Sequence, residues 1–293
     1  MTGYGVMNVK SFFERLDAAA VGMKSLVCVG LDPDPARMAV PDVFEFNRDI
    51  VDATRDACCA YKLQLAFYEA LGVPGIQAMQ RTVQYIRSTT PRTAIIGDCK
   101  RSDMGYVAAQ YAKAMFEVWD FDAVTVVPYM GSDSVEPWLQ YPDRGVYIVC
   151  RTSNPGGHDV QDLKYATSDR PRRVFEWVAD ASERWGRAGE NIGIVAGATT
   201  PDDVRELRHA HPALPFLVPG VGAQGGDVVA VSGSAANADG RGFIVNSSRG
   251  IIYASKDKAN FARAARDACI LLRDEINSAL ATGGNRLPTV KLR

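Results

Sequence analysis

Eight short apolar runs, each rich in β-branched residues and bounded by turn residues, recur along the chain. They cover residues 26–32, 60–65, 94–100, 123–128, 146–152, 192–198, 216–221 and 243–247. The segments between them have helical spacing. In residues 104–119, for example, the expected apolar stripe comprises Val107, Tyr111, Met115 and Val118. Because strands that alternate with helices pair in parallel, eight repeats predict an α/β fold, a closed (β/α)8 TIM barrel rather than an open sheet.

The 293 residues would allow either one large domain or two small ones. Since no Pro- or Ser-rich linker interrupts the strand series, we predict a single domain over residues 1–293 with its core at about 9–280. An extra N-terminal helix is expected at residues 9–20. The final helix is expected at 258–280, with one side formed by Phe261, Ala265, Ala268, Leu272, Ile276 and Ala279. Residues 283–293 resemble a flexible tail.

Composition argues against several classes of partner. The net charge of -1, without a long basic run, gives no reason to expect nucleic acid or an anionic membrane. The longest apolar stretches fall far short of the ~20 residues that a spanning helix needs, and no secretory signal is evident. The six cysteines form no CxxC pair, which favours reduced core thiols and a cytoplasmic location. The three histidines show no ligand pattern, so we expect no metal site.

Candidate functional residues lie at or just beyond the C-terminal ends of the apolar runs. They are Asp32, Lys62, Asp98, Lys100, Thr152, Gly220 and Ser247. In an α/β barrel these ends form the mouth where ligands bind. Seven residues from six separate runs would therefore converge on one pocket.

The charged cluster that ends the third run is the most informative of these positions. A period of two places Asp98 and Lys100 on the same face, pointing into the barrel mouth. A purely structural ion pair there would carry a desolvation cost, so function explains the pair better. Lys62 and Asp32 add charges to the same mouth, and alternating signs keep each group ionised, which suits proton transfer. Asp103 follows three residues after Lys100, and capping of the next helix is its alternative role.

At this cluster the sequence resembles a known family. The segment at residues 97–105, GDCKRSDMG, resembles the Asp-x-Lys-x-x-Asp signature of orotidine 5′-phosphate decarboxylases. VGLDPDP at 29–35 and YKLQLAFYE at 61–69 resemble the family's first-strand Asp and second-strand Lys segments. Segments that resemble the longer bacterial and archaeal variant (type 2) are VVPYMGSDSVEP, CRTSNPGGHDVQDL, VAGATTPDDVRELR, PGVGAQGGD and VNSSRGIIYA. The resemblance runs from about residue 9 to about residue 280.

A phosphate site is expected after the seventh and eighth runs. Residues 219–227 begin at Pro219 and form a glycine-rich loop whose backbone N–H groups can turn toward an anion, and Gln224 can donate its amide. Arg249 follows the eighth run and offers a charge-assisted bond to phosphate. A plain turn and a surface arginine are the alternatives. Residues 222–240 hold few large anchors and are expected to move as a lid.

The resemblance implies decarboxylation of orotidine 5′-phosphate to uridine 5′-phosphate without a cofactor. Lys100 would stabilise the carbanion at C6 and then protonate it, with Asp98 near the departing carboxylate. Lys62 would hold the carboxylates in register and reach the ribose, and Asp32 would bond a ribose hydroxyl. Ser153 would bond the amide edge of the pyrimidine, with turn capping as its alternative role.

The resemblance also implies a homodimer in which Asp103 reaches the neighbour's site. Val107 departs from the family, which often has a threonine there. One rival is a metal-dependent sugar-phosphate barrel, an aldolase or a decarboxylase of 3-keto sugar phosphates, which shares the signature but needs Mg²⁺. The other is a catalytically silent barrel that only binds nucleotides, which would not need Lys100.

Overall fold

A closed barrel of eight parallel strands forms the centre of the structure, a computed structural model that describes residues 10–187, 190–222 and 225–282. The strands are β1 (Val27–Leu31), β2 (Ala60–Gln64), β3 (Ala94–Arg101), β4 (Ala123–Val126), β5 (Gly145–Arg151), β8 (Ile192–Ala196), β9 (Phe216–Pro219) and β10 (Phe243–Ser247). Neighbours follow in chain order, and β10 pairs with β1 to close the ring. The predicted (β/α)8 barrel is confirmed, and each predicted apolar run coincides with one strand to within one or two residues at each end.

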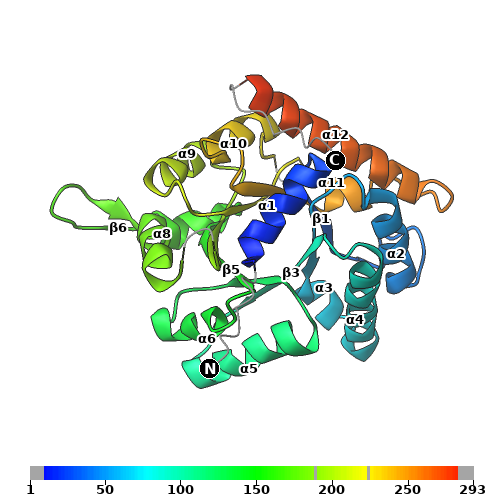
Figure 1. The fold of residues 1–293 in the computed structure, drawn as a ribbon, viewed down its shortest axis with the longest axis horizontal. Helices are drawn as coiled ribbons and strands as arrows, with labels where there is room; N and C mark the ends of the chain where they lie inside the picture. The colour runs from blue at the N-terminus through cyan, green and yellow to red at the C-terminus, as the bar shows by residue number, and fades with distance from the viewer. Residues whose placement is uncertain (1–9, 188–189, 223–224, 283–293) are drawn as a thin grey trace, which may run out of the picture.

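Helices surround the barrel (Figure 1). The longer ones are α2 (Val43–Thr54), α4 (Gly72–Thr89), α5 (Gly105–Lys113), α8 (Val174–Trp185), α9 (Pro201–Ala210), α10 (Val228–Ala235) and α12 (Phe261–Thr282). The short ones are α3 (Leu65–Glu69), α6 (Glu136–Leu139), α7 (His158–Gln161), α11 (Arg249–Ile252), and the 3₁₀ turns η2 (Ser132–Ser134) and η3 (Pro155–Gly157). In the part of the chain that the structure describes, no helix combines the length and apolarity needed to cross a membrane.

The expected N-terminal helix is present as α1 (Phe12–Met23), somewhat later than residues 9–20. A capping box fixes its start, because the Ser11 hydroxyl accepts a hydrogen bond from the Glu14 N–H while the Glu14 carboxylate accepts one from the Ser11 N–H. Residue 9 lies outside the described residues, and so does the whole predicted tail at 283–293.

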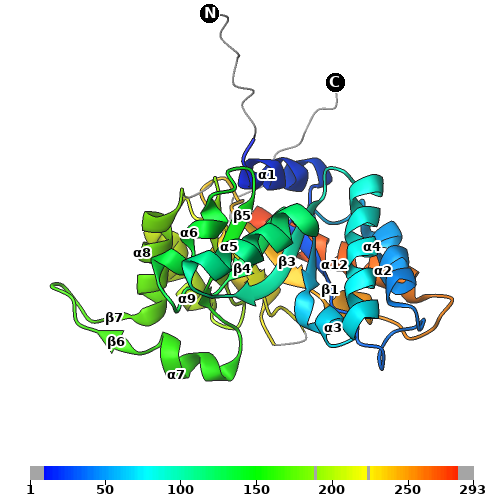
Figure 2. The same ribbon diagram turned by 90° about the horizontal axis from the view of Figure 1, so that it is seen from below.

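Helix α1 covers the end of the barrel where the strands begin (Figure 2). Phe12 and Phe13 pack edge-on against Tyr147 of β5, with ring centroids 6.3 and 5.3 Å away. A Cβ atom at Gly145 would lie only 2.2 Å from the Phe12 ring, so glycine is needed at the start of β5. Because α1 occupies this end, the opposite end of the barrel is left for a ligand.

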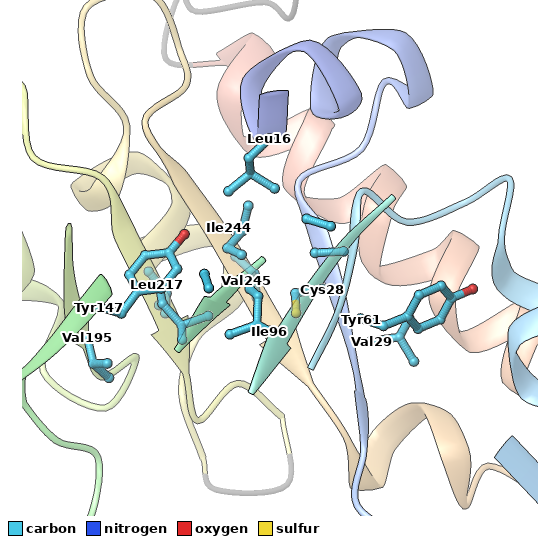
Figure 3. Packing of buried hydrophobic residues seen from close by; sticks show 14 of the residues in the cluster. Leu16, Cys28, Val29, Tyr61, Ile96, Tyr147, Val195, Leu217, Ile244 and Val245 are labelled. Carbon is cyan, nitrogen blue, oxygen red and sulfur yellow. The ribbon is translucent and has the colours of Figure 1, made fainter. Parts of the chain in front are cut away.

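The barrel interior below α1 is filled with buried side chains from several strands (Figure 3). Examples are Cys28, Ile96, Tyr147, Val195, Leu217 and Ile244. Alternate residues face the surrounding helices: the Tyr61 hydroxyl donates to the Val51 carbonyl of α2, while the next residue, Lys62, lines the barrel mouth. The apolar interior therefore ends where the charged residues begin.

The structure corrects three details of the predicted elements. Helix α5 continues into a π-helical turn, η1 (Ala114–Val118), and Val118 is exposed rather than part of the buried stripe. The buried face consists of Ala108, Ala112, Met115 and Phe116. It differs from the predicted stripe already in the regular part of α5, before the π turn begins. In α12 the buried stripe includes Cys269 and Leu280 in place of Ala268 and Ala279. The hairpin of β6 (Lys164–Tyr165) and β7 (Arg172–Arg173) was not predicted, since its strands have two residues each.

Candidate active site

A cavity of about 580 Å³ opens at the C-terminal ends of the strands, opposite α1. All seven residues that the sequence placed at the barrel mouth line it: Asp32, Lys62, Asp98, Lys100, Thr152, Gly220 and Ser247. Three further candidates also line it, namely Ser153, Pro219 and Arg249. The convergence expected from the strand ends is therefore present in one cavity.

Four of these side chains form a row of alternating charge along one wall. Lys62 Nζ lies 3.6 Å from Asp32 Oδ1 and 3.0 Å from Asp98 Oδ2. Lys100 Nζ lies 2.5 Å from Asp98 Oδ1. Lys62 and Asp98 are buried, whereas 43% of the Lys100 side chain is exposed. The buried pair of Lys62 and Asp98 thus lies behind the Lys100 ammonium group, which is accessible from the cavity.

The Asp98 carboxylate is held on both of its oxygens. Gln64 Nε2 donates to Oδ2 at 2.9 Å, and Thr125 Oγ1 donates to Oδ1 at 2.8 Å. Burial alone would raise the pKa of Asp98, but the charges of Lys62 and Lys100 and the hydrogen bonds to Lys100 and Thr125 hold it well below its ordinary value. Asp98 is therefore a fixed anion at neutral pH.

The pKa of Lys62 is also shifted in the direction that favours the charged form. Burial alone would lower the pKa of its ammonium group, yet the charges of Asp32 and Asp98 outweigh burial and raise it above the ordinary value. At neutral pH Lys62 therefore carries a full charge inside the barrel. The wall of the cavity is a preorganised electrostatic environment rather than a set of flexible surface charges.

The glycine-rich loop follows β9, and Gly220 and Val221 line the same cavity as the row of charges. Gly220 and Gly222 have φ angles of +99° and +63°, in the left-handed region that glycine favours. Gln224 lies outside the described residues, so its predicted contact is not tested. The expected lid over 222–240 includes α10, which packs against α9 and α12 as part of the barrel wall.

Other hydrogen bonds fix the loop that follows β5. Gln161 Oε1 accepts a hydrogen bond from the Thr152 backbone N–H, and Gln161 Nε2 donates to Thr152 Oγ1. At Gly197 a Cβ atom would lie 2.7 Å from the Ser153 nitrogen, so the loop approaches β8 closely. Ser153 is thereby placed at the edge of the cavity.

Asp103 differs from the other candidates in its location. It is not among the described residues that line the cavity, and its Oδ1 accepts a hydrogen bond from the Met104 N–H. Met104 occupies the N-cap position of α5, and no side chain caps that helix. The alternative role of Asp103 as the helix cap is therefore wrong.

The chain resembles known proteins over most of its length. The model of the orotidine 5′-phosphate decarboxylase / HUMPS family matches residues 25–265. The chain belongs to this family. It is 46% identical over 268 residues to the orotidine 5′-phosphate decarboxylase of Dehalococcoides mccartyi strain CBDB1, covering 91% of this chain and 97% of the relative. It is 44% identical over 274 residues to that of Cupriavidus necator, covering 91% and 98%.

Solved structures lead to the same family. The structure of Leishmania donovani OMP decarboxylase superposes with a TM-score of 0.78 at 36% sequence identity, covering 92% of this chain and 98% of that one. The family resemblance drawn from the Asp-x-Lys-x-x-Asp segment is thus confirmed by agreement over nearly the whole length.

Sequence reasoning missed several residues that line the cavity, and three of them form hydrogen bonds to Asp32 or Asp98. Gln64 follows Lys62 by two positions, and strand alternation could have placed it in the mouth. Thr125 lies inside an apolar run, where its single hydroxyl gave a weak signal. Tyr253, whose hydroxyl donates to the Asp32 carbonyl and accepts from the Asp34 N–H, gave none, because its position depends on how α11 ends.

Proposed function

We propose that this protein decarboxylates orotidine 5′-phosphate to uridine 5′-phosphate in pyrimidine nucleotide synthesis. Relatives of that name share 44–46% of its residues over nearly their whole lengths. The observation that carries the proposal is the row of alternating charges formed by Asp32, Lys62, Asp98 and Lys100, with Lys62 and Asp98 buried, in a cavity that Arg249 also lines. A barrel that only bound nucleotides would have no use for such a costly charge arrangement.

In the proposed reaction the bond between C6 and the carboxylate breaks, and its electron pair stays on C6 as CO₂ leaves. The Lys100 ammonium stabilises this developing charge and then gives a proton to C6, after which solvent reprotonates the amine. Asp98 lies beside the departing carboxylate and raises the energy of the bound substrate relative to the transition state. These side chains supply the whole reaction, so no metal or cofactor is required.

The remaining candidates bind the parts of the substrate that do not react. Asp32 bonds a ribose hydroxyl, and Lys62 holds the carboxylates and reaches the ribose. Ser153 bonds the amide edge of the pyrimidine. The phosphate is bound by the glycine-rich loop, with contacts from Pro219, Gln224 and Arg249. Binding energy from the phosphate, remote from C6, then contributes to catalysis.

We also propose a cytoplasmic homodimer in which Asp103 completes the partner's site. Next to Asp103 in the chain the large apolar side chains of Met104 and Tyr106 are exposed, and so are those of Tyr129 and Met130 in the loop after β4. Such exposure is typical of an interface between protein chains. The six buried thiols, free of disulfides, fit a reducing compartment.

The proposed activity is tested by following pyrimidine absorbance after adding orotidine 5′-phosphate. The comparison uses wild type, Lys100→Ala and, as control, Lys258→Ala, which changes an exposed lysine at the start of the α12 region. Wild type and the control should turn over substrate equally with or without EDTA, and Lys100→Ala should be inactive. Activity in Lys100→Ala, or none in wild type, would refute the proposal. Loss of wild-type activity in EDTA would favour the metal-dependent sugar-phosphate class.

A further inference from the structure

The pairing between β3 and β4 is interrupted at the charged cluster. Gly97 pairs with Val124, but after a register shift the next pair is Arg101 with Val126. Three residues of β3 therefore face a single residue of β4, Thr125. A bulge of this kind bends a strand and redirects side chains, and it takes backbone groups out of the regular ladder.

The side chain of Thr125 fills the gap left by the bulge. Its Oγ1 accepts a hydrogen bond from the Lys100 backbone N–H at 3.0 Å and donates one to Asp98 Oδ1 at 2.8 Å. Thr125 is buried, with 1% of its surface exposed. One hydroxyl thus provides a hydrogen-bond partner for the Lys100 N–H, which has no partner in the strand ladder, and also holds the Asp98 carboxylate.

The backbone of Lys100 shows why such a contact is needed. Its φ angle of +43° lies in the left-handed region, which non-glycine residues seldom adopt. Strained backbone of this kind persists only where surrounding contacts fix it, and it often occurs at functional sites. The hydrogen bond from the Lys100 N–H to Thr125 is such a contact, and it acts on the residue that carries the reactive ammonium.

We propose that Thr125 is a positioning residue for the decarboxylation, whose hydroxyl locks the Lys100 backbone and the Asp98 carboxylate into one arrangement. The inference rests on the proposed function and adds a residue to it. Thr125 lines the cavity, but both hydrogen bonds of its hydroxyl go to Lys100 and Asp98, which separates it from the residues proposed to bind substrate. Its effect should fall on the chemical step rather than on substrate affinity.

The test compares the steady-state kinetics of wild type, Thr125→Val and Thr125→Ser. Valine keeps the shape of threonine but removes the hydroxyl, so we expect kcat to fall about ten- to hundredfold, the effect of one lost hydrogen bond to a charged group. KM should change less than about threefold, because phosphate and pyrimidine contacts are untouched. Serine retains the hydroxyl and should restore most of kcat.

Thr82→Val is the matched control. Thr82 is a buried threonine of α4 whose Oγ1 donates to the Ala78 carbonyl and accepts from Asn47, away from the cavity. It should lower thermal stability without changing kcat. The inference fails if Thr125→Val keeps wild-type kcat, if Thr125→Ser loses as much kcat as valine, or if Thr82→Val loses it equally. An inactive wild type would instead remove the proposed function, and the inference with it.

Discussion

Replacing Lys62 by methionine removes the cation between two carboxylates and keeps a side chain of similar length. Lys62 Nζ lies 3.0 Å from Asp98 and 3.6 Å from Asp32. At an effective dielectric constant of about 20, each attraction is worth about 5 kcal/mol. Desolvation of the buried ammonium cancels several kcal/mol of that gain, so we expect a net loss of about 3–5 kcal/mol in the free energy of unfolding at pH 7.

The loss should depend on pH, and its sign follows from Asp98. In wild type the pKa of Asp98 is depressed, because Lys62 and Lys100 outweigh the effect of burial. A carboxyl group with a depressed pKa stabilises the fold above its unfolded pKa of about 3.9, and that stability disappears as the pH falls through the folded pKa. Without Lys62 the pKa of Asp98 in the folded protein rises. Protonation therefore removes the buried charge of Asp98 at a higher pH in the variant than in wild type. The stability difference between the two proteins should therefore shrink as the pH falls from 7 toward 4.

Urea unfolding followed by tryptophan fluorescence at pH 7 and pH 5 measures this difference, with midpoints and slopes compared between proteins. Lys258→Met, which changes an exposed lysine, controls for the loss of any positive charge. A difference below about 1 kcal/mol at pH 7 would contradict the electrostatic argument. If the difference in the free energy of unfolding between wild type and Lys62→Met stays constant or grows at pH 5, the charge of Asp98 is not the cause of the destabilisation.

Two further predictions concern the interface and the closed end of the barrel. If Asp103 acts across a dimer, mixing equal amounts of inactive Asp103→Ala and Lys100→Ala proteins under subunit exchange should recover about a quarter of wild-type activity. Half of the dimers are then mixed, and one of the two sites in each mixed dimer is intact. No recovery would place Asp103 in its own subunit's site. Gly145→Ala should lower stability by about 1–3 kcal/mol, because the added methyl group meets Phe12. Gly22→Ala, with nothing within 4 Å, is the control in thermal unfolding, and equal melting temperatures for both variants would contradict the predicted clash.

The barrel and its mouth could be predicted because they depend on local patterns. Strands buried on both faces give continuous apolar runs, and parallel pairing brings all their C-terminal ends to one edge. Asp32, Lys62 and Lys100 could therefore be assigned to one pocket without knowledge of any contact. The capping of α1 also follows from a local signal, the Ser11 and Glu14 spacing.

Features that depend on tertiary packing could not be predicted in this way. A strict period of two suggests that Asp98 and Lys100 share a face, yet the structure reaches that result through a bulge and a left-handed residue. The exposure of Val118 has a different origin, since the buried face of α5 contains the small residues Ala108 and Ala112 rather than the neighbouring Val107 and Tyr111. Hydrophobic periodicity alone does not decide between two adjacent apolar stripes of one helix.

Asp103 illustrates a different limit, because its proposed role needs a second copy of the chain. A residue three positions beyond Lys100 has left the barrel wall and stands beside Met104 and Tyr106, which are 50% and 74% exposed. Water disfavours apolar side chains at such exposure, whereas a partner surface would cover them. A carboxylate fixed within that patch would reach a neighbouring cavity only when the patch is buried, so in the proposed dimer burial of the patch and completion of the active site would occur together.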